Sequence, residues 1–81
     1  MSQNITVYTT NSCAYCGMVK RWLDTKGYAY QEINLEEQPE RQQEVLEMSG
    51  SLSVPVTVVS TAYGSKSVAV GYNIGKLASM L

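Results

Sequence analysis

Two cysteines, Cys13 and Cys16, are the only cysteines in this sequence, and they lie three positions apart. A strand-like run over residues 5–9 precedes them, and an amphipathic stretch over residues 17–26 follows. A Cys-x-x-Cys pair at the point where a strand gives way to a helix is typical of a redox site. The pair therefore predicts thiol–disulfide exchange.

The position of each thiol predicts a different task. Cys13 should lie at the N-terminal tip of the helix, where unpaired backbone N–H groups and the helix dipole stabilise a thiolate. Cys16, one turn further on, should be more buried and stay protonated. We therefore expect Cys13 to attack a substrate disulfide and Cys16 to resolve the mixed disulfide that results.

Two other uses of a cysteine pair are a structural disulfide and half of a zinc site. Structural disulfides are rare in reducing compartments. A mononuclear zinc site needs four ligands, and the chain has two cysteines and no histidine. Zinc would thus require a second protomer or carboxylates, and we expect no metal at this pair.

The composition predicts one α/β domain over residues 1–81, without a membrane span. The hydrophobic fraction of 44% is ordinary for a globular chain, and no apolar run approaches the ~18 residues of a span. Residues 1–4 lead directly into a strand without the basic and apolar regions of an export signal, so we expect a cytoplasmic protein. The net charge of −1 provides no basic field to attract nucleic acid.

The charges are unevenly distributed along the chain. Six of the seven acidic residues lie between Glu32 and Glu47, with Arg41 as the one base among them. By contrast, three bases follow the cysteines with only Asp24 opposing them, namely Lys20, Arg21 and Lys26. This pattern indicates either a solvated acidic helix face or a polarised surface that orients a partner protein.

The predicted order of elements is βαβαββα. Strands are expected over residues 4–9, 28–34, 54–59 and 67–70, and helices over 17–26, from Pro39 to near Gly50, and after Asn73, which should cap the last helix. The first two strands, joined through a helix, should be parallel, and the last two antiparallel. This order predicts a thioredoxin-like fold, a four-stranded mixed sheet with helices on both faces.

Each helix should present apolar side chains to this sheet. The expected side chains are Met18, Val19, Trp22 and Leu23 in the first helix, Val45 and Leu46 in the second with Met48 at its margin, and Ile74, Leu77, Ala78 and Leu81 in the last.

Pro55 opens the third strand, at a position where its missing N–H is not needed by the sheet. In a thioredoxin-like fold the preceding loop faces the cysteine pair, which leaves the backbone of Val54 free to bind an extended substrate. Tyr15, inside the motif, is a further candidate for substrate contact. Tyr72 is expected either to contact substrate or to cover the core.

Several segments together resemble the glutaredoxin family, especially its small bacterial NrdH-redoxin-like members. They are the Val-Tyr-Thr run at 7–9, the Cys-Ala-Tyr-Cys motif at 13–16, the Lys-Arg-Trp-Leu run at 20–23 with Gly-Tyr at 27–28, and Val-Pro-Val at 54–56. The resemblance covers essentially the whole chain. It implies a disulfide reductase with Cys13 as nucleophile, Cys16 as resolving thiol and Pro55 as a cis-proline.

The resemblance also implies which partners supply and accept the electrons. NrdH-redoxins pass electrons to a ribonucleotide reductase and are recharged by thioredoxin reductase, whereas ordinary glutaredoxins are recharged by glutathione. The chain has Thr10 and Asn11 where glutaredoxins commonly carry lysine. It also lacks the two aspartates that hold glutathione's amino end, and has Gly71-Tyr72 there, as NrdH-redoxins do, without their following arginine and proline.

We therefore expect a monomeric redoxin-type donor to a disulfide-containing protein, recharged by thioredoxin reductase. The alternative is a glutathione-dependent glutaredoxin. Two other classes of protein stay open. One is a [2Fe–2S] carrier in which Cys13 of two protomers and two glutathiones bind the cluster, and the other is an adaptor whose oxidation state controls a partner.

Overall fold

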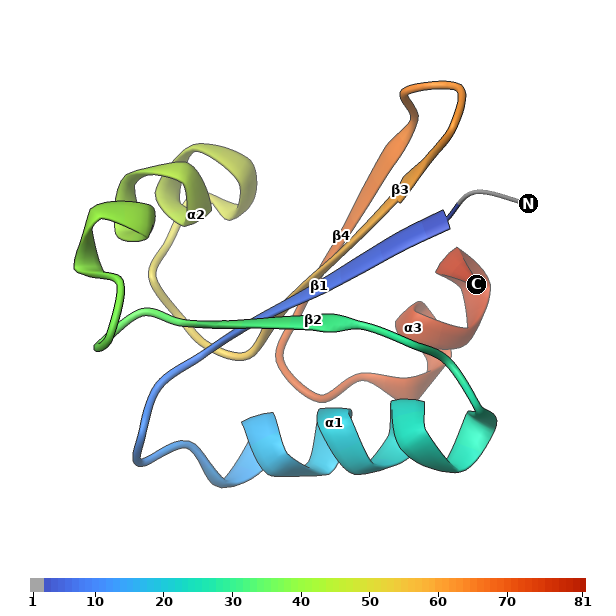
Figure 1. The fold of residues 1–81 in the computed structure, drawn as a ribbon, viewed down its shortest axis with the longest axis horizontal. Helices are drawn as coiled ribbons and strands as arrows, with labels where there is room; N and C mark the ends of the chain where they lie inside the picture. Colours follow the sequence, from blue (N-terminus) through green and yellow to red (C-terminus); the bar gives the residue numbers. More distant parts are fainter. Residues whose placement is uncertain (1–2) are drawn as a thin grey trace.

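The computed structural model describes residues 3–81, so the expected lead-in at Met1 and Ser2 lies outside the described residues. Its elements are β1 (Gln3–Thr9), α1 (Ala14–Lys26), β2 (Gln31–Asn34), the 3₁₀ turn η1 (Pro39–Arg41), α2 (Gln42–Ser49), β3 (Val56–Thr61), β4 (Lys66–Val70) and α3 (Ile74–Met80). The sheet order is β2-β1-β3-β4 (Figure 1). β1 and β2 are parallel, and the other two pairings are antiparallel. The predicted order and mixed sheet are confirmed.

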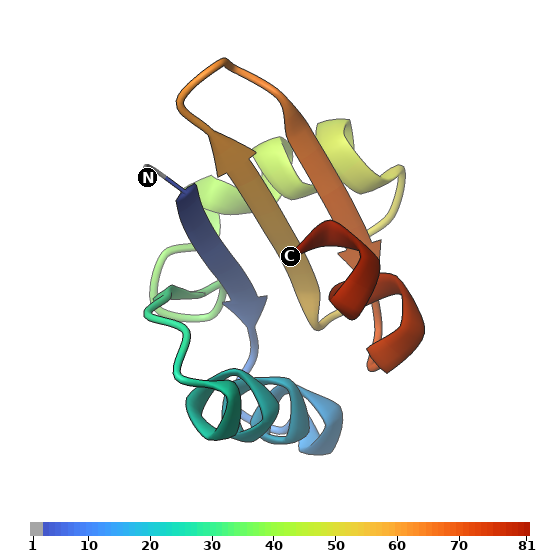
Figure 2. The same ribbon diagram turned by 90° about the vertical axis from the view of Figure 1, so that its right-hand side faces the viewer.

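The helices form a layer on each side of the sheet. α1 and α3 cover one face and α2 covers the other (Figures 1 and 2). Side chains alternate across β1, so that Ile5 and Val7 join the core under α1 and α3 while Tyr8 joins the core under α2. The first core also contains Val19, Leu23, Val59, Ala69 and Leu77, and the second contains Ile33, Leu35, Val45, Val56 and Val58.

α1 begins three residues earlier than predicted, because Cys13 itself serves as its N-cap. The helix buries Cys16, Val19 and Leu23 on one stripe. Met18 is 38% exposed, so its predicted burial is wrong: it lies about 100° around the helix from Val19, off the buried stripe of α1. Trp22 packs against the edge of the core and is half-buried.

The second strand is shorter than predicted. The backbone N–H of Tyr28 donates to the carbonyl of Leu23 at 3.0 Å. This bond, together with the left-handed Gly27, makes residues 27–28 part of the C-terminal cap of α1. As a result β2 starts only at Gln31.

Three further burial predictions are corrected. Leu46 is 42% exposed, while Met48 packs against the core, because Met48 lies three residues after the fully buried Val45 and shares its stripe. Ile74 is also 42% exposed, and Ala78 is exposed as well, whereas Leu77 between them is buried. Asn73 does cap α3, since its Oδ1 accepts from the N–H of Lys76 at 3.0 Å.

A polar contact fixes α2 to the sheet. The hydroxyl of the buried Tyr8 donates to Glu44 of α2, and Arg41 donates two hydrogen bonds to the same carboxylate, at 2.6 and 2.9 Å. Burial, followed by the bond to Glu44, raises the pKa of Tyr8 to about 12. The phenol therefore remains a neutral donor throughout the physiological pH range.

Replacing Thr57 with valine is expected to stabilise the protein. The hydroxyl of Thr57, the second residue of β3, is buried and has no hydrogen-bond partner among the described residues, and valine has nearly the same shape. Removing an unsatisfied buried hydroxyl should raise the free energy of unfolding by about 1 kcal/mol. Urea denaturation would measure this, and a Thr57→Val protein less stable than wild type would contradict it.

Candidate active site

The cysteine pair lies where β1 leads into α1. Cys13 has extended backbone angles, and its Sγ accepts the N–H of Cys16 at 3.1 Å. The two residues form a disulfide with their Cα atoms 5.2 Å apart. Cys13 is half-buried, whereas Cys16 is only 2% exposed. An incoming group therefore reaches the sulfur of Cys13 more easily than that of Cys16.

The sheet brings the loop before β3 to the same end as the cysteines. Val56 pairs with Tyr8 near the end of β1 on one side and with Val70 at the end of β4 on the other. The Val54–Pro55 peptide bond at this end is cis, as the resemblance implied. The ring of Pro55 is buried, and within residues 3–81 the backbone N–H and C=O of Val54 make no hydrogen bond.

Gly71 and Tyr72 join this loop to the cysteine motif. The N–H of Gly71 donates to the carbonyl of Pro55 at 2.7 Å, with Gly71 in the left-handed region at φ 82°. The ring of Tyr72 stacks on that of Tyr15, with centroids 6.4 Å apart and planes 15° apart. The structure thus brings together all seven residues selected from the sequence, with Tyr15 59% exposed.

Three residues that hold the loop before Cys13 were not selected from the sequence. Asn11 donates from its backbone and its side chain to the carboxylate of Glu36, at 2.8 and 3.1 Å. Its Oδ1 accepts from Asn34 at 2.8 Å. Nothing in the sequence pairs positions so far apart, and the only signal was their common place at the carboxyl ends of the two parallel strands.

A second set of contacts lies between the middle of α1 and the parallel strands of the sheet. The buried hydroxyl of Thr9 donates to Glu32 of β2 at 2.8 Å, and Lys20 of α1 donates to the same carboxylate at 3.0 and 3.1 Å. The hydrogen bond from Thr9, then the contact with Lys20, holds the pKa of Glu32 below its usual value. This carboxylate thus connects β1, β2 and α1.

Glu32 is expected to make the free energy of unfolding depend weakly on pH in the acidic range. Because its pKa is lower in the folded state, its stabilising contribution is complete above the ordinary carboxyl pKa and is lost as the pH falls through the folded-state pKa. The effect should be below about 1 kcal/mol, since the side chain is partly exposed. Urea denaturation at pH 7 and pH 3 should show a smaller loss of stability for Glu32→Gln than for wild type. An equal loss in both proteins would contradict it.

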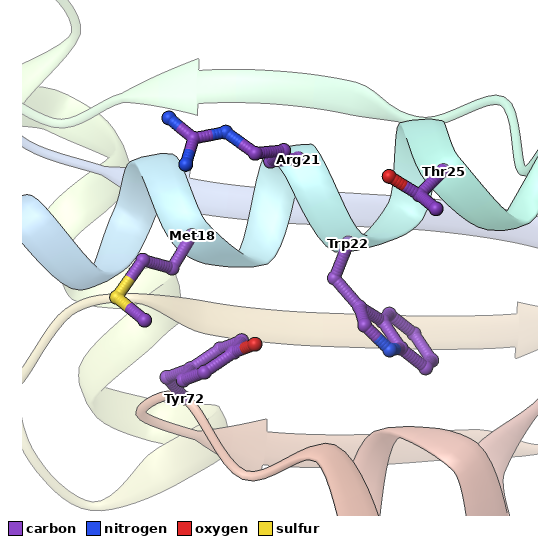
Figure 3. A pocket seen from close by; sticks show the side chains of 5 residues that line it. All are labelled: Met18, Arg21, Trp22, Thr25 and Tyr72. Carbon is purple, nitrogen blue, oxygen red and sulfur yellow. The ribbon is translucent and has the colours of Figure 1, made fainter.

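A hollow of about 230 Å³ lies beside the stacked tyrosines. Met18 and Trp22 extend from α1 toward Tyr72, and Arg21 and Thr25 complete the lining (Figure 3). The sequence pattern does not predict this hollow, because the helical periodicity places Met18 and Trp22 on the same apolar stripe as Val19 and Leu23.

Among residues 3–81, no three His, Cys, Asp or Glu side chains are grouped so as to hold a metal ion. Within the same range, none of the helices has the length and apolarity needed to cross a bilayer.

The chain shares this arrangement with known proteins. The sequence profile of the glutaredoxin family matches residues 5–62, which include the cysteine pair and the cis-proline. The chain belongs to the glutaredoxin family. The glutaredoxin-like protein NrdH of Lactococcus lactis subsp. cremoris is 48% identical over 52 residues, which are 64% of this chain and 71% of that protein.

Solved structures of other proteins have the same fold as this glutaredoxin. The thioredoxin-like protein BC3987 superimposes with a TM-score of 0.79 and 31% identity, over 96% of this chain and all of that one. The NrdH-redoxin of Escherichia coli superimposes with a TM-score of 0.77 and 26% identity, over 96% of this chain and 95% of that one. The predicted thioredoxin-like fold is therefore confirmed, and the protein is a thiol–disulfide oxidoreductase like other members of its family.

Proposed function

We propose that this glutaredoxin is a redoxin-type dithiol donor that reduces disulfides in a partner protein. The observation that carries the proposal is the asymmetry of the pair: Cys13 is accessible at the helix N-cap, whereas Cys16 is buried behind it. Such an arrangement favours a thiolate at the outer position and a protonated thiol at the inner one.

The reaction has two steps. The thiolate of Cys13 attacks one sulfur of the substrate disulfide, so that a mixed disulfide forms and the other substrate sulfur leaves as a thiolate that takes up a proton. Cys16 then loses its proton and attacks the sulfur of Cys13, which releases the second substrate thiol. Two electrons have passed to the substrate, and the Cys13–Cys16 disulfide remains.

The loop before β3 is suited to hold the substrate during this exchange. The unbonded backbone of Val54 can pair with an extended segment on either side of the substrate cysteine. Pro55 and Gly71 are fixed to each other by the 2.7 Å hydrogen bond, which gives this segment a rigid support. Tyr15, in the first turn of α1, has an exposed ring that can contact the same substrate segment.

The proposed reductant is thioredoxin reductase, and the proposed substrate is a protein disulfide such as that of a ribonucleotide reductase. Two observations support this branch. The E. coli NrdH-redoxin that superimposes on this chain is described by its thioredoxin-like activity profile. Residues 70–74 of this chain also carry no acidic side chain that could bind the amino group of glutathione. We also propose that the protein is a monomer and acts in the cytoplasm.

Consumption of NADPH with insulin as the disulfide substrate tests the reductant. The protein is supplied either with thioredoxin reductase or with glutathione and glutathione reductase, and Cys13→Ser protein serves as the blank in each arm. We expect turnover only with thioredoxin reductase. Turnover only with glutathione would replace the proposed branch by a glutathione-dependent glutaredoxin, and no turnover in either arm would overturn the donor function.

A further inference from the structure

The hollow between α1 and Tyr72 has the properties of a pocket for one apolar side chain. Three of its five lining residues are large and apolar or aromatic, namely Met18, Trp22 and Tyr72. All three are at least partly accessible. Small pockets of this kind, next to polar groups at the rim, are where single anchoring side chains bind in protein interfaces.

The hollow is linked to the cysteine motif through Tyr72. Tyr72 lines the hollow and also stacks on Tyr15, which lies between the two cysteines in the sequence. Met18 and Trp22 are five and nine residues after Cys13, about 8 and 13 Å along the helix axis. Along the helix axis the middle of the hollow is thus about 10 Å from Cys13, a span that about three residues of extended chain would cover.

The charge around the hollow selects the kind of partner. Arg21 lies at its rim and takes part in no ion pair among residues 3–81. Lys26 and Lys76, on the same side of the sheet, are also exposed, and Asp24 is the only acidic residue of α1 and α3. Three of the seven acidic residues lie instead on η1 and α2, on the opposite side of the sheet (Figure 1), namely Glu40, Glu44 and Glu47. A negatively charged segment would therefore be attracted to the α1 side and repelled from the α2 side.

We propose that this hollow binds the disulfide substrate protein at an acidic segment next to its cysteines. A large apolar residue about three positions from the reacting cysteine would enter between Met18, Trp22 and Tyr72, and a neighbouring carboxylate would pair with Arg21. This site is distinct from the backbone of Val54, which binds whatever sequence surrounds the disulfide. The inference rests on the proposed donor function and names the chemistry of its partner.

The test uses three synthetic peptides, each closed by one disulfide. The first carries leucine three residues outside the ring on both sides, with glutamates next to each leucine. The second has serine in place of leucine, and the third has lysine in place of glutamate. Pre-reduced protein is mixed with each peptide at low ionic strength, and the single-turnover rate constant is divided by that for a small disulfide, hydroxyethyl disulfide.

For the wild-type protein, this ratio should be about tenfold higher for the first peptide than for the second, because an anchor residue is lost. Arg21→Glu should lower the ratio for the first peptide about tenfold, and added salt should remove most of the difference. Lys26→Glu is the matched control, since it makes the same charge change on the same helix outside the hollow. Met18→Ser should remove the preference for leucine, whereas Leu46→Ser on α2 should keep it.

Equal ratios for the leucine and serine peptides, or equal effects of Arg21→Glu and Lys26→Glu, would overturn the docking site. So would a concentration-dependent dimer that Arg21→Glu abolishes, because the hollow would then bind the acidic side of a second copy. Failure of the wild-type protein to reduce even hydroxyethyl disulfide would refute the donor function instead, and the small-disulfide rate thus separates the two failures.

Discussion

Replacement of Cys13 by serine is expected to abolish disulfide reduction completely. A serine hydroxyl does not ionise near neutral pH and cannot form the mixed disulfide, so the first step has no nucleophile. The fold should be retained, because a serine oxygen can still accept the N–H of Cys16 and cap α1. NADPH consumption with insulin would measure the loss, with the circular dichroism spectrum as the control for folding.

Replacement of Cys16 by serine is the matched experiment. The first step should still occur, and the mixed disulfide should accumulate because no resolving thiol attacks it. Non-reducing electrophoresis after incubation with a protein disulfide should show a covalent complex, and dithiothreitol should separate it into the two proteins by reducing the mixed disulfide. If the Cys13→Ser protein formed that complex and the Cys16→Ser protein did not, the assignment of the two roles would be reversed.

Replacement of Leu23 by alanine is expected to cost about 2–5 kcal/mol of unfolding free energy. Leu23 is fully buried on the sheet side of α1, in the core it shares with Val19 and Leu77. That cost is a large part of the about 4–12 kcal/mol expected for a domain of this length. Urea denaturation measures it, and we expect the midpoint to fall sharply.

Leu46→Ala provides the control for this prediction. Leu46 is 42% exposed on α2, so the same truncation should cost less than about 1 kcal/mol there. Equal losses at the two positions would mean that the core under α1 contributes much less to stability than its burial indicates.

The sequence predicted the order of the elements because each is bounded by a local signal. Gly27 ends α1, Asn73 caps α3, and Pro55 precedes β3. The burial of single helical residues was harder to predict, since neighbouring apolar residues such as Val19 and Met18 differ by about 100° in direction. Only the position of the sheet decides which of them is covered.

The site was predictable to the extent that its residues belong to motifs. The cysteine pair and Pro55 were identified from spacing and context. Asn11 and Glu36 hold the loop before Cys13, but they follow the ends of different strands and belong to no sequence motif. The hollow beside Tyr72 depends on how α1 sits against the loop before α3, which sequence periodicity does not specify.

The strand register has a practical consequence for following this protein in experiments. Val56 begins β3 at the redox end, whereas Thr61 ends it beside Gln3, about 17 Å away along the strand. The turn that follows, with Tyr63 93% exposed, therefore projects from the end opposite the cysteines (Figure 1). A fluorophore or a surface tether attached at this turn leaves the reactive sulfur facing outward, so that electron transfer to a partner can be recorded on immobilised molecules of uniform orientation.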